Sequence, residues 1–125
     1  MNDDRSMGLL AWQLSLYASG HRDRRNLLLH AVTVPLFMAG TVALLSAAVL
    51  SPWVAAGGAV AMAIAIAAQG RGHRREGTAP VPFRHPFDAL ARLVVEQWVT
   101  FPRFVLNGGF ARAFREGELR DGSRA

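Results

Sequence analysis

The chain has 125 residues, of which 51% are hydrophobic, and its formal net charge at pH 7 is +5. That length allows one compact unit, residues 1–125, and the apolar fraction exceeds what a small soluble domain usually carries. Because the chain contains no cysteine, disulfides, thiolate metal sites and a cysteine nucleophile are excluded.

The first predicted element is a helix over residues 7–19, whose leucines and aromatic residues cover much of its surface. This pattern is typical of a helix that lies at a membrane interface. Gly20 ends the helix, and Asp23 is a suitable N-cap for the one that follows.

Two long apolar segments come next, residues 24–50 and 53–69, joined by a Ser-Pro turn. They approach the ~20 residues that a helix needs to cross a bilayer. In the second segment, Gly57, Ala61 and Ala65 are four residues apart and predict a packing face. The sequence thus predicts an all-α fold, a membrane-embedded helical hairpin with flanking amphipathic helices. The alternative is a soluble helical hairpin buried in an oligomer.

The rest of the chain is predicted as a basic, proline-rich connector (70–86), an amphipathic helix (87–107) and a polar, frayed tail (110–125). In the amphipathic helix, Arg92 and Glu96 lie opposite an apolar stripe and form an i,i+4 pair. Its charged residues make a third membrane crossing improbable, so we expect it to lie on the membrane or against the hairpin.

Arginines flank both predicted membrane helices, and none lies in the turn between them. The positive-inside rule then predicts that both flanks, and with them both termini, lie in the cytoplasm. All 14 basic residues are arginine, which is typical of a GC-rich bacterial genome, so we expect an integral protein of the bacterial inner membrane. The small-residue faces are compatible with a homo-oligomer. Nucleic acid is not an expected partner, because the basic residues flank apolar spans and do not alternate with exposed aromatics.

Histidines gather at the cytoplasmic end of the hairpin. Antiparallel folding about the turn pairs His30 with His73, and His21 can join them if the chain turns before the first long helix. With Asp23 and Glu76 nearby, three imidazoles form the nitrogen and carboxylate set favoured by Fe(II) and other transition metals. The alternatives are a structural polar cluster inside the bundle and a proton or ion pathway.

Two amides accompany these histidines. Asn26 and Gln69 each lie one helical turn before a histidine of a predicted membrane helix, and we expect them to orient the imidazoles. Tyr17 is predicted either to contact the site or to serve as a membrane-interface aromatic. His85, between prolines in the connector, is predicted to be a loop residue rather than a ligand.

The pattern Tyr17-x3-His21-x4-Asn26-x3-His30-x4-Pro35, followed by Gln69-x2-Gly72-His73-x2-Glu76-x3-Pro80, resembles the membrane family typified by the fungal 2-hydroxy fatty acid dioxygenase. The resemblance covers residues 17–80. It implies an Fe(II)-dependent enzyme that uses O2 in alpha-oxidation and shortens a long-chain 2-hydroxy fatty acid by one carbon. It also implies catalytic His21, His30 and His73, which would bind the metal with Glu76, while Asn26, Gln69 and Tyr17 would support them.

In this interpretation, the substrate chelates iron through its hydroxyl and carboxylate groups, and the carboxylate accepts hydrogen bonds from Arg25, Arg71 or Arg74. The partners are then a long-chain fatty acid or other lipid, O2 and the membrane. The alternative function is a non-enzymatic membrane module, in which the polar cluster holds the hairpin together and the basic rim binds anionic lipid or a protein partner.

Overall fold

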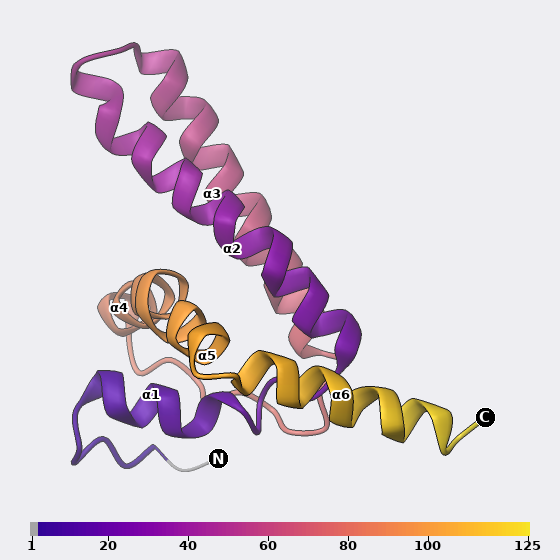
Figure 1. Cartoon of the computed structure of the whole chain (residues 1–125). Coiled ribbons are helices and arrows are strands. Elements are labelled where there is room, and N and C mark those ends of the chain that lie inside the picture. The colour runs from indigo at the N-terminus through magenta and orange to yellow at the C-terminus, as the bar shows by residue number, and fades with distance from the viewer. Residues whose placement is uncertain (1–2) are drawn as a thin grey trace.

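A computed structural model describes residues 3–125, and that range contains helices, turns and loops but no strand. In chain order the elements are α1 (Leu9–Tyr17), α2 (Arg24–Leu45), the 3-10 turn η1 (Ser46–Ala48), α3 (Pro52–His73), α4 (Pro86–Val95), the π-helical turn η2 (Glu96–Thr100), α5 (Phe101–Leu106) and α6 (Gly109–Gly122). Helices α2 and α3 form a long antiparallel hairpin, and the other helices gather around one end of it (Figure 1). The all-α fold expected from the sequence is confirmed.

Side-chain caps set the two ends of the hairpin. At the start of α2, the Asp23 carboxylate accepts a hydrogen bond from the Asn26 N–H at 3.0 Å, as its position before the helix predicts. The Ser51 hydroxyl accepts from the Trp53 N–H at 3.1 Å, and Pro52 occupies the first turn of α3. Helix α3 continues to His73, so the connector begins four residues later than predicted.

Small residues let the two helices pack closely. A Cβ atom on Gly40 would lie 2.7 Å from the Gly58 carbonyl oxygen, and one on Gly58 would lie 2.5 Å from that of Gly40. On α3 the buried small residues Gly58, Ala65 and Gly72 are seven apart, the spacing of a coiled-coil seam. Of the predicted face, Ala65 is buried and Ala61 lies next to Gly40, but Gly57 lies outside the seam, since a Cβ there would meet open space.

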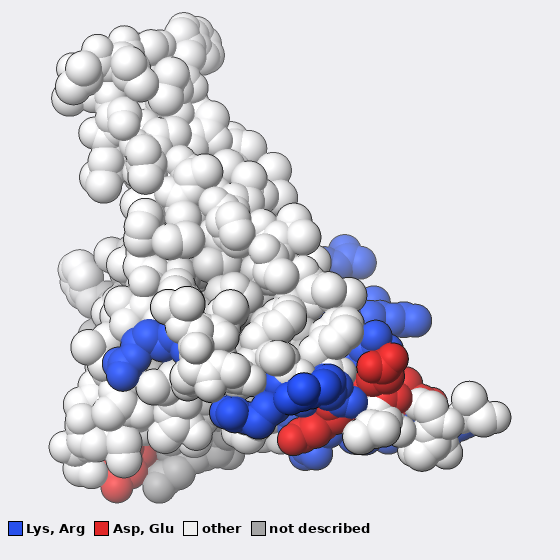
Figure 2. All heavy atoms as spheres, in the orientation of Figure 1, with Lys and Arg blue, Asp and Glu red and all other residues white. Residues whose placement is uncertain are grey.

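Both hairpin helices are long and apolar enough to cross a membrane: Arg24–Ala48 including η1, and Pro52–His73. Only 33% and 17% of their most apolar stretches are buried. The end of the hairpin far from the other helices exposes large apolar side chains, with Val49 and Trp53 86% and 85% accessible, and shows no charged residue on the face in Figure 2. An apolar surface of this kind needs apolar surroundings.

The amphipathic helix predicted for 87–107 is a kinked unit of α4, η2 and α5 that lies against the hairpin. In α5, Phe101 and Phe104 are buried, whereas Leu106 is exposed. In α4 and η2, by contrast, apolar residues such as Phe87 and Leu90 face outward and the polar residues are buried: Asp88, Arg92, Gln97 and Thr100. This is the reverse of a helix on the surface of a soluble protein. The sequence pattern located the two faces but not which of them points inward.

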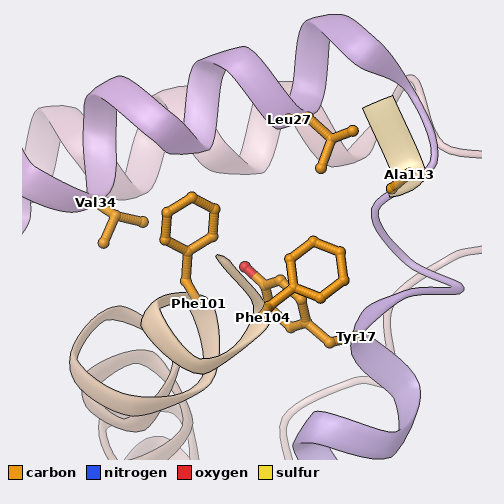
Figure 3. Packing of buried hydrophobic residues seen from close by; sticks show 6 residues of the cluster. All are labelled: Tyr17, Leu27, Val34, Phe101, Phe104 and Ala113. Atoms are coloured by element: carbon orange, nitrogen blue, oxygen red, sulfur yellow. The ribbon is translucent and has the colours of Figure 1, made fainter. Parts of the chain in front are cut away.

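A small apolar core lies between this unit and the foot of the hairpin. Phe101 and Phe104 from α5 pack with Leu27 and Val34 of α2 and with Tyr17 at the end of α1, and Ala113 of α6 completes the cluster (Figure 3). This core fixes the position of α5 and of the turn that precedes it.

The expected frayed tail at 110–125 is wrong for most of that range, because α6 is a helix that packs against the start of α2. Gly108 adopts the left-handed conformation (φ 82°) that lets the chain turn from α5 into α6. Phe114 then lies 4.4 Å beneath the Arg24 guanidinium, and Arg120 Nη2 donates to the Arg22 carbonyl at 2.6 Å. These contacts with α2 outweigh the polar composition of the segment.

Ion pairs attach the N-terminal segment to α4. Arg5 donates to both carboxylate oxygens of Asp88, which also accepts from the Arg84 N–H at 2.9 Å. The Arg84 side chain bonds to Asp3 at 2.8 Å. We call Asp3, Arg5, Arg84 and Asp88 the N-terminal clasp.

Candidate metal centre

Four side chains from different elements converge at the foot of the hairpin. They are His21 in the turn after α1, His30 in α2, His73 at the end of α3, and Glu96 at the start of η2. One potential ligand atom from each lies within 4.8 Å of all the others. The predicted convergence of three histidines is present, and we call the four residues the His/Glu cluster.

Backbone carbonyls orient two of the imidazoles. His21 Nδ1 lies 2.8 Å from the Tyr17 carbonyl oxygen, and His30 Nδ1 lies 3.0 Å from that of Asn26. Because a carbonyl can only accept, each Nδ1 carries the hydrogen, and in its neutral form each ring presents a bare Nε2 lone pair to the cluster. Such a bond fixes the tautomer that a metal-ligating histidine needs.

When the imidazoles are neutral, the atoms that meet inside the cluster are all hydrogen-bond acceptors. The Nε2 atoms of His21 and His30 are 3.3 Å apart, and Glu96 Oε1 lies 3.7 and 3.5 Å from them. Facing lone pairs repel unless a cation, either a proton or a metal ion, lies between them. Three nitrogen donors and one carboxylate fit Fe(II) or a similar divalent transition metal.

Burial sets the charge states of the groups outside the hairpin helices. Burial lowers the pKa of His21 to about 3, with a further contribution from His30, so this imidazole is neutral at physiological pH. Burial by itself would raise the pKa of Glu96, but a hydrogen bond with His30 and the positive charge that the surrounding imidazoles carry when protonated lower it to about 2. A neutral imidazole and an ionised carboxylate are the forms that bind metals.

Tyr17 contacts the cluster, as one of its two sequence interpretations predicts. Its ring stacks on His21 at a centroid distance of 3.7 Å, and its hydroxyl donates to Glu96 Oε1 at 3.2 Å. Burial, followed by the charge of Glu96, raises the pKa of Tyr17 well above its usual value, so the hydroxyl keeps its proton. Tyr17 therefore holds both a histidine and the glutamate in place.

The two predicted amides support the cluster through its scaffold. Gln69 and Gln97 exchange two amide hydrogen bonds of 2.9 and 2.7 Å, and Gln69 also donates to the Thr33 hydroxyl at 3.0 Å. These bonds join α3, α2 and η2 beside Glu96. Asn26 supports His30 with its backbone carbonyl and donates its side-chain amide to Glu76 at 2.7 Å.

The prediction of Glu76 as a metal ligand disagrees with its position in the structure. Its carboxylate accepts from the backbone N–H groups of Arg22 and Asp23 at 3.0–3.2 Å and from the Asn26 amide, which places it at the N-terminus of α2. An anion there is stabilised by the helix dipole and unpaired amides. Asp23 is likewise occupied as the cap of α2.

Glu96 takes the place in the cluster that Glu76 was expected to fill. Sequence reasoning missed it because no motif spacing links it to the histidines. The available signal was its position on the polar face of the amphipathic helix, next to Gln97. His85 lies outside the cluster, as predicted, and its Nδ1 accepts from the Asp88 N–H at 3.2 Å to cap α4.

The arginines that were predicted to bind the substrate carboxylate lie apart from the His/Glu cluster. Arg25, Arg71 and Arg74 line a groove on the hairpin with Arg75, Leu29, Ala68 and Gly72. We call this the basic groove, and no residue of the His/Glu cluster lines it. The positions chosen from the sequence therefore do not converge with the histidines.

A different cavity, of about 80 Å³, adjoins the cluster. His21, His73 and Glu96 form part of its wall, and the remaining lining residues are Trp12, Gln13, Leu16, Tyr17, Gly20, Thr78, Pro80, Val81 and Arg92. We call it the cluster cavity. By the volume of water in the liquid, it has room for a few water molecules or a small polar group.

Fold and site together define a helical protein with a three-histidine, one-carboxylate constellation at the base of a hairpin of membrane-crossing length. The family model described as 2-hydroxy-palmitic acid dioxygenase Mpo1-like matches residues 8–103, which include the whole His/Glu cluster, and the chain belongs to this family. The family resemblance seen in the sequence is confirmed. No curated protein and no solved structure shows a significant match to the chain.

Proposed function

We propose that the protein is an Fe(II)-dependent dioxygenase that acts on long-chain 2-hydroxy fatty acids at a membrane surface and shortens them by one carbon. The observation that carries the proposal is the His/Glu cluster, whose facing acceptor atoms require a cation, in a chain whose family is described by this activity. His21, His30, His73 and Glu96 would hold the iron. The chemistry that Fe(II) supplies when bound is the activation of O2, which these side chains do not provide.

The proposed reaction balances without a further reductant. A 2-hydroxy acid and O2 give the acid one carbon shorter, CO2 and water: the hydroxyl carbon becomes the new carboxyl group and the old carboxyl group leaves as CO2. The protein's own groups hold the proposed metal ligands in position. Tyr17 holds the side chains of Glu96 and His21 in place, and the Gln69–Gln97 pair keeps η2 against the hairpin.

The fold suits a substrate with a polar head and a long apolar tail. The cluster cavity is too small for a whole fatty acid, but it can take a carboxyl and hydroxyl head, while Trp12, Leu16, Pro80 and Val81 offer an apolar wall for the start of the chain. The hairpin would lie in the bilayer with the cluster at its polar edge. We place that edge, and both termini, on the cytoplasmic side of the bacterial inner membrane, where the flanking arginines are expected.

The first test compares metal content and turnover in the same preparations. Protein purified anaerobically in mild detergent and loaded with Fe(II) should hold iron near one equivalent. It should also consume O2 with 2-hydroxyhexadecanoic acid and form pentadecanoic acid, measured by mass spectrometry. His30→Ala and His73→Ala should lose both iron and turnover.

His85→Ala is the matched control, because this histidine lies outside the cluster and caps α4. It should retain iron and activity. Folded wild type that binds no iron, or that turns over equally well without His30 and His73, would refute the enzymatic proposal and favour the non-enzymatic membrane module.

A further inference from the structure

A single arginine faces the cluster cavity together with the proposed metal ligands. Among the residues that form the cavity wall, Arg92 is the one Lys or Arg side chain. It lies on α4 four residues before Glu96, so the two side chains share a helix face about 5–6 Å apart at Cβ. A small anion in the cavity would therefore lie between a guanidinium group and the His/Glu cluster.

The Arg92 side chain is held rigidly from one side. It is 8% exposed, and its Nη1 and Nη2 donate to the consecutive carbonyls of Pro82 and Val81 at 3.1 and 2.9 Å. The guanidinium also lies over the rings of Phe83 and Trp12, 4.6 and 5.1 Å from their centroids. An arginine fixed in this way loses little conformational entropy when it binds a ligand.

The other edge of the guanidinium has no acceptor. Nε is buried and has no hydrogen-bond partner in the described structure, and Nη2 can donate a second hydrogen beyond its bond to Val81. Together, Nε and Nη2 form the side-on fork that binds a carboxylate with two parallel hydrogen bonds. A buried donor without an acceptor is costly, so a carboxylate that reached this edge would remove that cost.

The acids near Arg92 make their closest contacts with other groups. Asp88 makes its close contacts with Arg5 and with the Arg84 backbone, and it lies 3.8 Å from Arg92 Nη1. Glu96, the other acid that attracts Arg92, faces the imidazoles of the His/Glu cluster. With Glu96 included, these groups hold three arginines and three acids, so the recognition would depend on the free hydrogen-bond donors of Arg92 rather than on a surplus charge.

We propose that Arg92, rather than an arginine of the basic groove, recognises the carboxylate of the 2-hydroxy acid; this inference rests on the proposed function. The free edge of its guanidinium binds the carboxylate from the cavity side, and the hydroxyl carbon then lies toward the His/Glu cluster. Arg92 thus acts as a specificity-determining residue that selects acids over neutral lipids of the same length.

The test is equilibrium binding under anaerobic conditions, so that no turnover occurs. Two probes are compared in each protein sample, 2-hydroxyhexadecanoic acid and 1,2-hexadecanediol, which keeps the chain and the hydroxyl but lacks the carboxylate. Wild type should prefer the acid. Arg92→Gln should weaken acid binding about tenfold or more, as expected for charge-assisted hydrogen bonds, and leave diol binding unchanged.

Because Arg92 also anchors the connector, the readout is the ratio of the two affinities, which does not depend on the fraction of folded protein. Arg92→Lys keeps the charge but not the fork, and it should lose most of the preference. Arg115→Gln on the exposed face of α6 is the charge-matched control and should keep the wild-type ratio.

The outcomes separate this inference from the proposed reaction. An unchanged ratio in both Arg92 variants overturns the inference, and loss of the preference in Arg71→Gln instead would assign recognition to the basic groove. Wild type that prefers the acid in an Arg92-dependent way but never consumes O2 would uphold the inference and refute the dioxygenase proposal. Wild type with no preference for the acid overturns the inference.

Discussion

Two glutamates illustrate how position decides the role of a residue. Glu76 and Glu96 carry the same carboxylate, but one accepts backbone N–H bonds at the start of α2 and the other faces three imidazoles. The first arrangement stabilises a helix terminus, whereas the second creates a site for a cation.

We therefore expect opposite effects from matched substitutions. Glu96→Gln should lower the iron content strongly, because a neutral amide replaces the one anionic ligand. Glu76→Gln should keep the iron but lower the stability by about 1–3 kcal/mol, because its charge-assisted hydrogen bonds at the start of α2 weaken. Elemental analysis and thermal unfolding of both variants check this, and iron loss confined to Glu76→Gln would contradict our assignment.

Two adjacent glycines offer an equally sharp comparison for the hairpin seam. Alanine at Gly58 would meet the Gly40 carbonyl, so Gly58→Ala should destabilise the hairpin by about 1–3 kcal/mol. Alanine at Gly57 meets open space and should be neutral or stabilising by up to about 1 kcal/mol. Unfolding in mild detergent measures both, and equal effects would show that the seam is placed wrongly.

Among the structural elements, the ones that can be predicted from the sequence are those specified by neighbouring residues in the chain. The sequence predicts the apolar length of α2 and α3, the cap at Asp23, the turn at Ser51-Pro52 and the pairing of His30 with His73. These follow from composition, capping chemistry and antiparallel geometry. Helix α6 and Glu96 depend instead on contacts between distant parts of the chain. No periodicity in residues 110–125 indicates that Arg24 will cover Phe114, and no spacing connects Glu96 to the histidines.

The N-terminal clasp should give α4 a pH-dependent attachment. Hydrogen bonding to Arg5 is the main effect that lowers the pKa of Asp88 below its unfolded value near 3.8. A carboxyl group whose pKa is lowered by folding stabilises the protein above the unfolded pKa and loses that contribution as the pH falls. The clasp should therefore be fully effective above about pH 4 and weaken below it.

The unfolding temperature measured from pH 3 to 7 tests this expectation. Asp88→Asn should lower the unfolding temperature at pH 6. It should also make the unfolding temperature decrease less when the pH is lowered below 4. Asp121→Asn, which changes an exposed acid 4.0 Å from Arg24, serves as the control. If Asp88→Asn keeps the full acid-induced fall, other carboxyl groups are responsible for it.

For the molecule as a whole, shape and charge indicate how it would lie at a membrane. The hairpin projects beyond the other helices, and the charged residues visible in Figure 2 gather around its base. The outward apolar residues of α4 extend the same apolar surface toward the base. If the hairpin crosses a bilayer, lipid rather than water would cover this side of α4, as its buried polar face leads us to expect.

Single cysteines can test this arrangement, because the chain contains none of its own. We expect a membrane-impermeant maleimide to label Val49→Cys from one side of the bilayer and Ser123→Cys from the other. Ile64→Cys, midway along the hairpin, should react only after detergent is added. Labelling of Val49→Cys and Ser123→Cys from the same side, or free reaction of Ile64→Cys, would contradict a membrane-spanning hairpin.

The π-helical turn η2 limits where insertions and deletions can be accepted as the sequence evolves. In η2 the Phe101 N–H donates to the Glu96 carbonyl, so the turn holds one residue more than an α-helical turn. Loss of one residue here would rotate everything beyond it by about 100°, the angle between successive residues of an α-helix. Glu96 and the aromatic residues of α5 could not then both keep their places. We therefore expect natural variants to tolerate insertions and deletions in the connector but to keep the residue count between Glu96 and Phe101 constant.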